Sequence, residues 1–208
     1  MAHLLNIECS PRDSKSASIT VANAFLAAYR ELQPATTIDT LNVWDESLPE
    51  FDSEAIGAKY KGAANQPMEG PEAAIWERIQ SLAARFHKAD RIVMGVPMWN
   101  FAYPYKLKQL IDLACQRTCC SASMGLPFGP LLKTPRALVI YSRGQSYPES
   151  SPTPASEFDY QTGYIDFWLK FIGVQEVETL LVDNTWSEKA AASIAGASIK
   201  AKAIAAGF

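Results

Sequence analysis

The sequence predicts an α/β fold in which a five-stranded parallel sheet is covered by helices on both faces. Short apolar runs typical of buried strands alternate with longer segments that repeat apolar residues at helical spacing, and they do so five times. Strands that alternate with helices pair in parallel, because each helix carries the chain back across the sheet. A length of 208 residues fits a single domain over residues 1–208.

The elements of the first half follow from these patterns. A strand is expected over His3–Glu8, and an amphipathic helix follows it with Ser18 as its N-cap. Ile38–Val43 is expected to form the second strand. Residues 45–70 hold several Pro and Gly residues and predict a long excursion with a little helix, before a second helix over residues 75–86.

The second half repeats the alternation. Three more strands are expected over Arg91–Val96, Ala137–Tyr141 and Val177–Val182. Three more helices are expected: one with Pro104 in its first turn, one over Phe158–Ile172 and an alanine-rich one over Ser187–Ala206. Residues 117–135 show no convincing period, and residues 145–157 are rich in Ser and Pro and are expected to form a loop.

Composition and charge exclude several classes of protein. Hydrophobic residues make up 48% and charged residues 20%, which argues against a disordered chain. A net charge of −3 argues against nucleic-acid binding, which needs a basic surface. The sequence holds neither an apolar run long enough to cross a membrane nor a secretory signal, so a cytoplasmic location is expected. Four cysteines without a Cys-x-x-Cys pair and only two histidines make a zinc site improbable.

In parallel sheets ligands bind beyond the carboxyl ends of the strands, which directs attention to three segments. The first contains Ser10, Ser16, Ala17 and Ser18 and leads into a helix. Hydroxyls and the N–H groups of a helix N-terminus suit an anion, and Arg12 or Lys15 adds a cation. The glycine motifs of nucleotide-binding loops are absent, which favours a phosphate monoester. The alternative is an ordinary polar turn.

The segment after the third strand is Pro97-Met98-Trp99-Asn100-Phe101. Large apolar side chains on a loop outside the expected core suit a planar heterocycle, with Asn100 and backbone amides bonding its polar edge. The alternative is a small apolar cluster that covers the end of the sheet.

The segment after the fourth strand is Ser142-Arg143-Gly144-Gln145. Glycine in such a loop lets backbone N–H groups approach a ligand closely. The alternative is an ordinary turn with a surface arginine. The fold would place all three segments side by side, which strengthens the case for one shared site.

The helix expected over Phe158–Ile172 carries more apolar surface than one sheet face can bury. Tyr164, Phe167, Trp168 and Phe171 share one face, and aliphatic residues occupy the neighbouring one. Excess aromatic surface of this kind indicates a partner chain. The alternative is a helix buried beneath the long loops.

These motifs together resemble one family, and the likeness extends through most of the chain. The segments that carry it are Ser10-x5-Ser16-x-Ser18, Pro97–Phe101 followed by Leu107-Lys108 and Asp112, Ser142-Arg143-Gly144, and Trp168-Leu169-x-Phe171-Ile172-Gly173. The chain resembles the FMN-dependent NADH-azoreductases, relatives of the dimeric NAD(P)H:quinone oxidoreductases. The resemblance implies a three-layer flavodoxin-like fold with strand order 2-1-3-4-5, and a homodimer.

The resemblance also implies a role for each segment. The serine loop, with Ser10, Ser16, Ala17 and Ser18, would hold the phosphate of a tightly but noncovalently bound FMN. Pro97, Met98, Trp99, Asn100 and Phe101 would wrap the flavin ring, and Ser142, Arg143 and Gly144 would lie near its pyrimidine end. Gln145 stands where the family usually has a second glycine.

The implied chemistry is hydride transfer from NADH or NADPH to FMN and then to a quinone or azo compound in the same pocket. The cofactor carries that chemistry, so no separate catalytic side chains are expected. The family's aromatic Thr-Phe-x-Tyr stretch is replaced here by Cys120-Ser121-Ala122-Ser123. Phe128 is a candidate substitute as a wall of the substrate pocket, and Phe171 is a candidate wall of the partner's pocket.

Two other functions compete with this interpretation. Low-molecular-weight tyrosine phosphatases place Cys-x5-Arg after the first strand. Here Cys9 is followed by five residues and then Lys15, which lacks the forked donors of arginine, and the chain has no Asp-Pro dipeptide. A flavodoxin-like electron carrier or flavin-binding protein is the second alternative, but such carriers are usually strongly acidic.

Overall fold

The computed structural model describes residues 2–116, 132 and 134–208. Its strands are β1 (His3–Glu8), β2 (Thr37–Asn42), β3 (Arg91–Pro97), β4 (Arg136–Ser142) and β5 (Glu176–Val182). They form one parallel sheet in the order β2-β1-β3-β4-β5, which confirms the expected flavodoxin-like topology. The helical elements are η1 (Asp13–Lys15), α1 (Ala17–Leu32), α2 (Ser53–Ala63), α3 (Gly70–Lys88), α4 (Tyr105–Ala114), α5 (Ala155–Phe158), α6 (Thr162–Ile172) and α7 (Ala190–Ala205).

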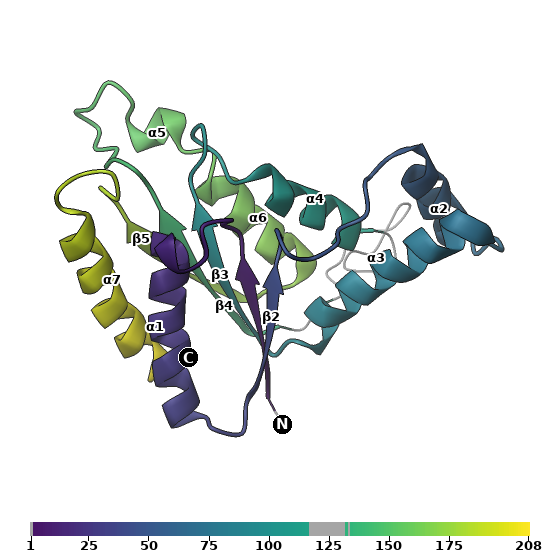
Figure 1. The fold of residues 1–208 in the computed structure, drawn as a ribbon, viewed down its shortest axis with the longest axis horizontal. Coiled ribbons are helices and arrows are strands. Elements are labelled where there is room, and N and C mark those ends of the chain that lie inside the picture. Colours follow the sequence, from purple (N-terminus) through teal and green to yellow (C-terminus); the bar gives the residue numbers. More distant parts are fainter. Residues whose placement is uncertain (1, 117–131, 133) are drawn as a thin grey trace.

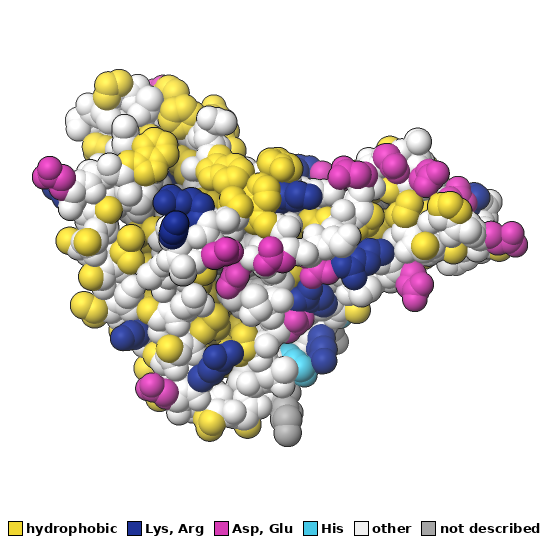
Figure 2. Space-filling model, viewed as in Figure 1, with side chains coloured by type: hydrophobic (Ala, Val, Ile, Leu, Met, Phe, Trp, Pro, Cys, Tyr) yellow, Lys and Arg dark blue, Asp and Glu magenta, His cyan; other side chains and the backbone are white. Residues whose placement is uncertain are grey.

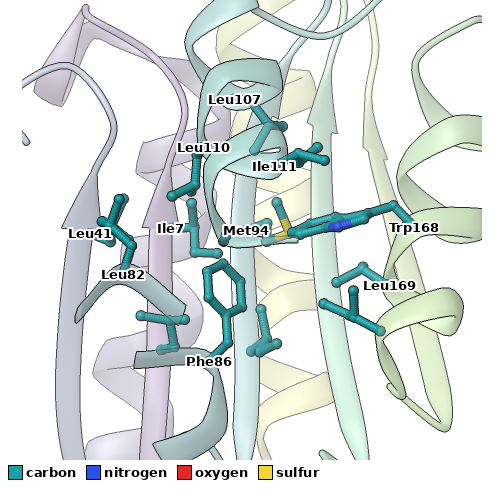
Figure 3. Packing of buried hydrophobic residues seen from close by; sticks show 14 of the residues in the cluster. Ile7, Leu41, Leu82, Phe86, Met94, Leu107, Leu110, Ile111, Trp168 and Leu169 are labelled. Carbon is teal, nitrogen blue, oxygen red and sulfur yellow. The ribbon is translucent and has the colours of Figure 1, made fainter. Parts of the chain in front are cut away.

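Helices cover both faces of the sheet, and each face has its own core (Figure 1). α1 and α7 pack on one face, where Phe25 stacks on Tyr29 with ring centroids 5.6 Å apart. α3, α4 and α6 cover the other face. There, Phe86, Met94 and Trp168 come together between sheet and helices (Figure 3). Burial of the apolar strands on both faces explains their nearly continuous hydrophobic runs.

The excursion over residues 45–70 contains more regular structure than the sequence predicts. The eleven-residue helix α2 begins after Asp52, whose Oδ1 accepts hydrogen bonds from the N–H groups of Glu54 and Ala55. This is an N-cap signal that the glycines and prolines around it obscured. α2 packs against α3, and the pair projects from the sheet as an arm (Figure 1).

The helix predicted over Phe158–Ile172 begins four residues later than expected, and the short helix α5 (Ala155–Phe158) lies almost wholly in residues 145–157, which were expected to form a loop. α5 ends at Phe158, and α6 begins at Thr162 because the carboxylate of Asp159 accepts the N–H groups of Gln161 and Thr162. Of the four aromatic residues expected to share a face that meets a partner chain, Trp168 is instead buried in this chain's own core. The outer face of α6 consists of the half-buried Tyr164 and Phe171 and the exposed Phe167.

The prediction of Ser18 as N-cap is wrong by two residues, since α1 begins at Ala17 with Ser16 at the N-cap position. Among the helices that the structure describes, none is both long and apolar enough to cross a membrane.

Candidate functional site

A pocket opens at the carboxyl end of the sheet, where the three segments singled out in the sequence meet. It is lined by Ser10, Arg12, Lys15, Ser16, Ala17, Pro97, Met98, Trp99, Ser142, Gly144, Thr185, Trp186 and Ile194. Lys and Arg side chains lie beside hydrophobic ones at this end of the molecule, near the start of α1 (Figure 2). The pocket therefore combines a cationic, hydroxyl-rich part with an apolar part.

The cationic part is built at the start of α1. The N–H groups of a first helical turn have no partner within the helix, and the side chain of Ser16 makes no capping hydrogen bond here. Its Oγ instead lies 3.2 Å from Oγ of Ser18, which is fully buried and does not line the pocket. Free N–H groups, a hydroxyl and the cations of Arg12 and Lys15 fit a phosphate monoester. These residues therefore suit the phosphate of FMN.

Gly95 on β3 allows this helix end to lie close to the sheet. A Cβ atom added there would lie 3.3 Å from the backbone carbonyl of Ser18, a contact tighter than most side chains accept. The start of α1, which lines the cationic part of the pocket, is thus positioned by backbone packing against β3.

The apolar part is held by contacts between loops. The N–H group of Met98 donates to the carbonyl of Ser142 at 2.8 Å, which joins the loops after β3 and β4. The ring of Trp99 packs against Trp44 with centroids 5.5 Å apart, and Nε1 of Trp44 donates to the carbonyl of Cys9 at 3.1 Å. Trp44 was not predicted as a site residue, although it follows β2 at the same carboxyl end of the sheet.

Asn100 and Phe101 form the tip of a two-residue turn and do not line the pocket. Trp99 and Ala102 exchange two backbone hydrogen bonds, and both tip residues have positive φ, 47° for Asn100 and 68° for Phe101. A bulky residue rarely adopts this conformation. It is stabilised by the N–H group of Tyr160, which donates to the carbonyl of Phe101 at 3.0 Å.

Arg143 does not line the pocket either, although Ser142 and Gly144 on either side of it do. Its guanidinium is buried, where it donates to Asp159 at 2.5 Å and to Gln161 at 3.2 Å. Burial raises the pKa of Asp159, but hydrogen bonds from Thr162 and the charge of Arg143 outweigh it and hold that pKa below its usual value. Gln145 is exposed and lies outside the pocket lining.

The loop between β5 and α7 adds a wall that the sequence analysis missed. Thr185 and Trp186 line the pocket, and their N–H groups donate to the carbonyls of Arg143 and Gly144 at 3.0 and 3.1 Å. The rule that ligands bind beyond the carboxyl ends of strands applies to β5 as well. Applied to the fifth strand, that rule would have indicated the loop that holds Thr185 and Trp186.

Phe171 lies away from this pocket in its own chain. It lines a second hollow between α2, α4 and α6, together with Phe51, Lys59, Ile111, Asp112, Cys115, Gln116, Tyr164, Phe167 and Trp168. The predictions for Phe128 and for Cys120–Ser123 lie outside the described residues.

Cys9 is unsuited to act as the nucleophile of a phosphatase. Its side chain is fully buried, and burial raises the pKa of its thiol far above the usual value. The reactive thiolate is therefore suppressed at neutral pH. Within the described part of the chain, no cluster of three or more His, Cys, Asp or Glu residues could hold a metal ion.

Comparison with known proteins agrees with this geometry. A sequence profile of the flavodoxin-like fold matches residues 2–204. The FMN-dependent NADH:quinone oxidoreductase 2 of Burkholderia lata is 57% identical over 99% of both chains. The chain belongs to the family of FMN-dependent NADH:quinone oxidoreductases. A further member from the same organism, FMN-dependent NADH:quinone oxidoreductase 9, is 45% identical over 89% of both chains.

Solved structures of similar proteins have the same fold. The FMN-dependent NADH-azoreductase from Bacillus anthracis, determined in complex with FMN, is 25% identical and superimposes with a TM-score of 0.89 over 99% of this chain and 98% of its own. The NAD(P)H:quinone oxidoreductase from Methanothermobacter marburgensis is 17% identical, with a TM-score of 0.73 over 98% of this chain and 97% of its own, and shares the fold.

Proposed function

We propose that the chain is an FMN-dependent NADH oxidoreductase that transfers two electrons, as hydride, to quinones or azo compounds. The observation that carries the proposal is the pocket itself, where a cationic helix N-terminus and a wall of large apolar side chains meet. When bound, FMN supplies the hydride-transfer chemistry. NADH, which the relatives are named for, is the expected donor, and NADPH is the alternative. Because NADH is supplied in the cytoplasm, the proposal implies that location.

In this proposal the chain's residues bind and orient the cofactor. Ser10, Ser16 and the first N–H groups of α1 bind the phosphate, with Arg12 and Lys15 neutralising its charge. Met98 and Trp99 cover the flavin ring and exclude water from it. The open side of the pocket admits donor and acceptor in turn, which is the arrangement a two-step exchange requires.

Binding of FMN and riboflavin to Ser16→Ala tests this assignment. A lost hydrogen bond to a charged group weakens binding by about 10- to 150-fold. We expect that loss for FMN and little change for riboflavin. Ser18→Ala should add little to the loss in the Ser16→Ala background, because Ser18 is buried outside the pocket lining and its hydroxyl contacts that of Ser16. Ser14→Ala is the matched control, because Ser14 is exposed in the same segment and does not line the pocket. Equal losses for FMN and riboflavin would contradict the phosphate assignment.

A second measurement separates an enzyme from an electron carrier. The enzyme oxidises NADH in the presence of a quinone without a partner protein, whereas a carrier needs a reductase. Purified protein that binds FMN but does not oxidise NADH would favour the carrier.

We further propose that the active unit is a homodimer joined in part through the outer face of α6. Phe167 is 62% exposed and stacks on Phe171, with centroids 5.9 Å apart. Both line a hollow that mixes aromatic side chains with Lys59, Asp112 and Gln116, as contacts between subunits commonly do. Phe171 would then help to wall the partner's pocket.

The test of the dimer is sedimentation together with NADH–quinone turnover. Phe171→Glu places an unpaired charge in a desolvated contact, so we expect both the dimer and turnover to be lost. A variant that stays dimeric and fully active would contradict the proposal, as would a wild-type monomer with normal turnover.

A further inference from the structure

Trp186 is the most exposed large hydrophobic side chain among the described residues, with 79% of its surface accessible. It nevertheless lines the pocket, beside Thr185 and Ile194. An indole left in water at the lip of a ligand pocket carries apolar surface that a bound ligand would cover.

The position of the indole is fixed by Gly144. The N–H group of Trp186 donates to the carbonyl of Gly144, and a Cβ atom added at Gly144 would lie 2.4–2.7 Å from three carbons of the indole ring. No side chain fits at residue 144 while the ring stays in place. The glycine therefore makes room for the tryptophan, in addition to any approach of its backbone to a ligand.

Sheet order places Trp186 on one side of the β4 loop and Trp99 on the other. β4 lies between β3 and β5, Trp99 follows β3, and Trp186 follows β5. Ser142, which ends the central strand of the three, and Gly144, which follows it, line the pocket with Trp99 and Trp186. Trp99 and Trp186 thus lie on opposite sides of the loop after β4, which is the loop expected near the pyrimidine end of the flavin.

We propose that Trp186 is a further cofactor-binding residue, whose indole covers the ring or ribityl part of bound FMN and reaches that position because residue 144 is glycine. This inference rests on the proposed flavin site. It assigns Trp186 to the part of FMN that riboflavin shares, whereas Ser16 is assigned to the phosphate.

Binding titrations followed by flavin fluorescence test the inference. Loss of an aromatic contact of this size weakens binding by about 10- to 100-fold. We expect Trp186→Ala to weaken FMN and riboflavin equally and to leave the bound flavin more fluorescent, because an adjacent indole quenches it. Trp186→Phe should restore part of the affinity. Ile199→Ala is the matched control, since Ile199 is equally isolated on α7 at 71% exposed and does not line the pocket.

A double-mutant cycle tests the link between the two residues. Gly144→Ala displaces the indole and should weaken FMN about as much as Trp186→Ala. In the Trp186→Ala background the same glycine change should cost less than about threefold, because the ring it would strike is gone. A Gly144→Ala loss that persists unchanged in that background would overturn the link.

The wild type distinguishes a failure of the flavin site from a failure of the role assigned to Trp186. If it binds no FMN, the proposed function fails. If it binds FMN and Trp186→Ala binds both flavins within twofold of wild type, the flavin site stands and the assignment of Trp186 is overturned.

Discussion

Removal of Arg143 tests whether this side chain holds the loops around the pocket or touches the cofactor. The side chains of Arg143 and Asp159 are only 4% and 14% exposed, and Gln161, the second partner of the guanidinium, donates in turn to the carbonyl of Val96 at 3.0 Å. Arg143 thus connects the carboxyl ends of β3 and β4 to the start of α6.

The magnitude follows from what each change leaves unpaired. Removing one partner of a buried ion pair costs about 3–5 kcal/mol. Arg143→Gln leaves the carboxylate of Asp159, and that of nearby Asp183, without the charge that compensates them. We expect the upper part of that range, or a fall in Tm of about 8–20 °C for a chain of this size. Asp159→Asn should lower the free energy of unfolding by less, because the guanidinium of Arg143 keeps its hydrogen bond to Gln161 and the nearby negative charge of Asp183.

The assay is thermal unfolding at fixed protein and FMN concentrations, with FMN affinity of the folded variant measured separately, since bound ligand also shifts Tm. Arg143→Lys serves as the conservative control: it keeps the charge but loses the forked donors, so an intermediate Tm is expected. Because the guanidinium lies outside the pocket, FMN affinity should change less than about tenfold. A variant with wild-type Tm and a hundredfold loss of FMN would refute this reasoning and restore Arg143 as a cofactor contact.

Three further predictions follow from the described contacts. The pKa of Asp159 is lower in the folded protein than in the unfolded chain. Its contribution to the free energy of unfolding is therefore complete above about pH 5 and declines as the pH falls through the folded pKa. When the free energy of unfolding is measured against pH, Asp159→Asn should make its decline at acid pH less steep. Cys9→Ala should retain NADH–quinone turnover, and neither it nor the wild type should release phosphate from an aryl phosphate; release that depends on Cys9 would revive a phosphatase. Gly62→Ala, whose Cβ would lie 2.5 Å from the ring of Trp76, should destabilise by about 1–3 kcal/mol in denaturant unfolding, whereas Gly196→Ala, with open space around it in α7, should stabilise by about 0.5–1 kcal/mol.

The sequence was sufficient for the centre of the sheet because β1, β3 and β4 are buried on both faces and are therefore nearly continuous apolar runs, whereas the edge strands β2 and β5 are partly exposed and mix polar with apolar residues. It was also sufficient to predict that Ser16, Met98 and Gly144 lie close together, because the carboxyl ends of parallel strands lie at the same end of the sheet. The rule that ligands bind beyond the carboxyl ends of parallel strands does not depend on any single side chain.

What the sequence did not predict depends on contacts between distant residues. Arg143 turns into the protein because its partner Asp159 lies sixteen residues further along the chain, in a segment that was expected to be helical. The same Asp159 sets the start of α6, four residues after the predicted start of that helix. The rule for strand ends points to the loop after β5 but not to Trp186 within it, because the position of this side chain depends on Gly144 in the neighbouring loop.

The position of β1 in the sheet also shapes how the chain is made. β1 pairs with β2 on one side and β3 on the other, but Arg91, the first residue of β3, is synthesised only after the whole α2–α3 arm. At ribosomal speeds of roughly 5–20 residues per second, the interval between the end of β2 and the end of β3 is about 3–11 s. Throughout it the open edge of β1 and the apolar side chains of Leu4, Leu5 and Ile7 lack their final cover. Until β3 emerges, a sheet of β1 and β2 would therefore keep an unpaired strand edge, and β3 is the element that closes it.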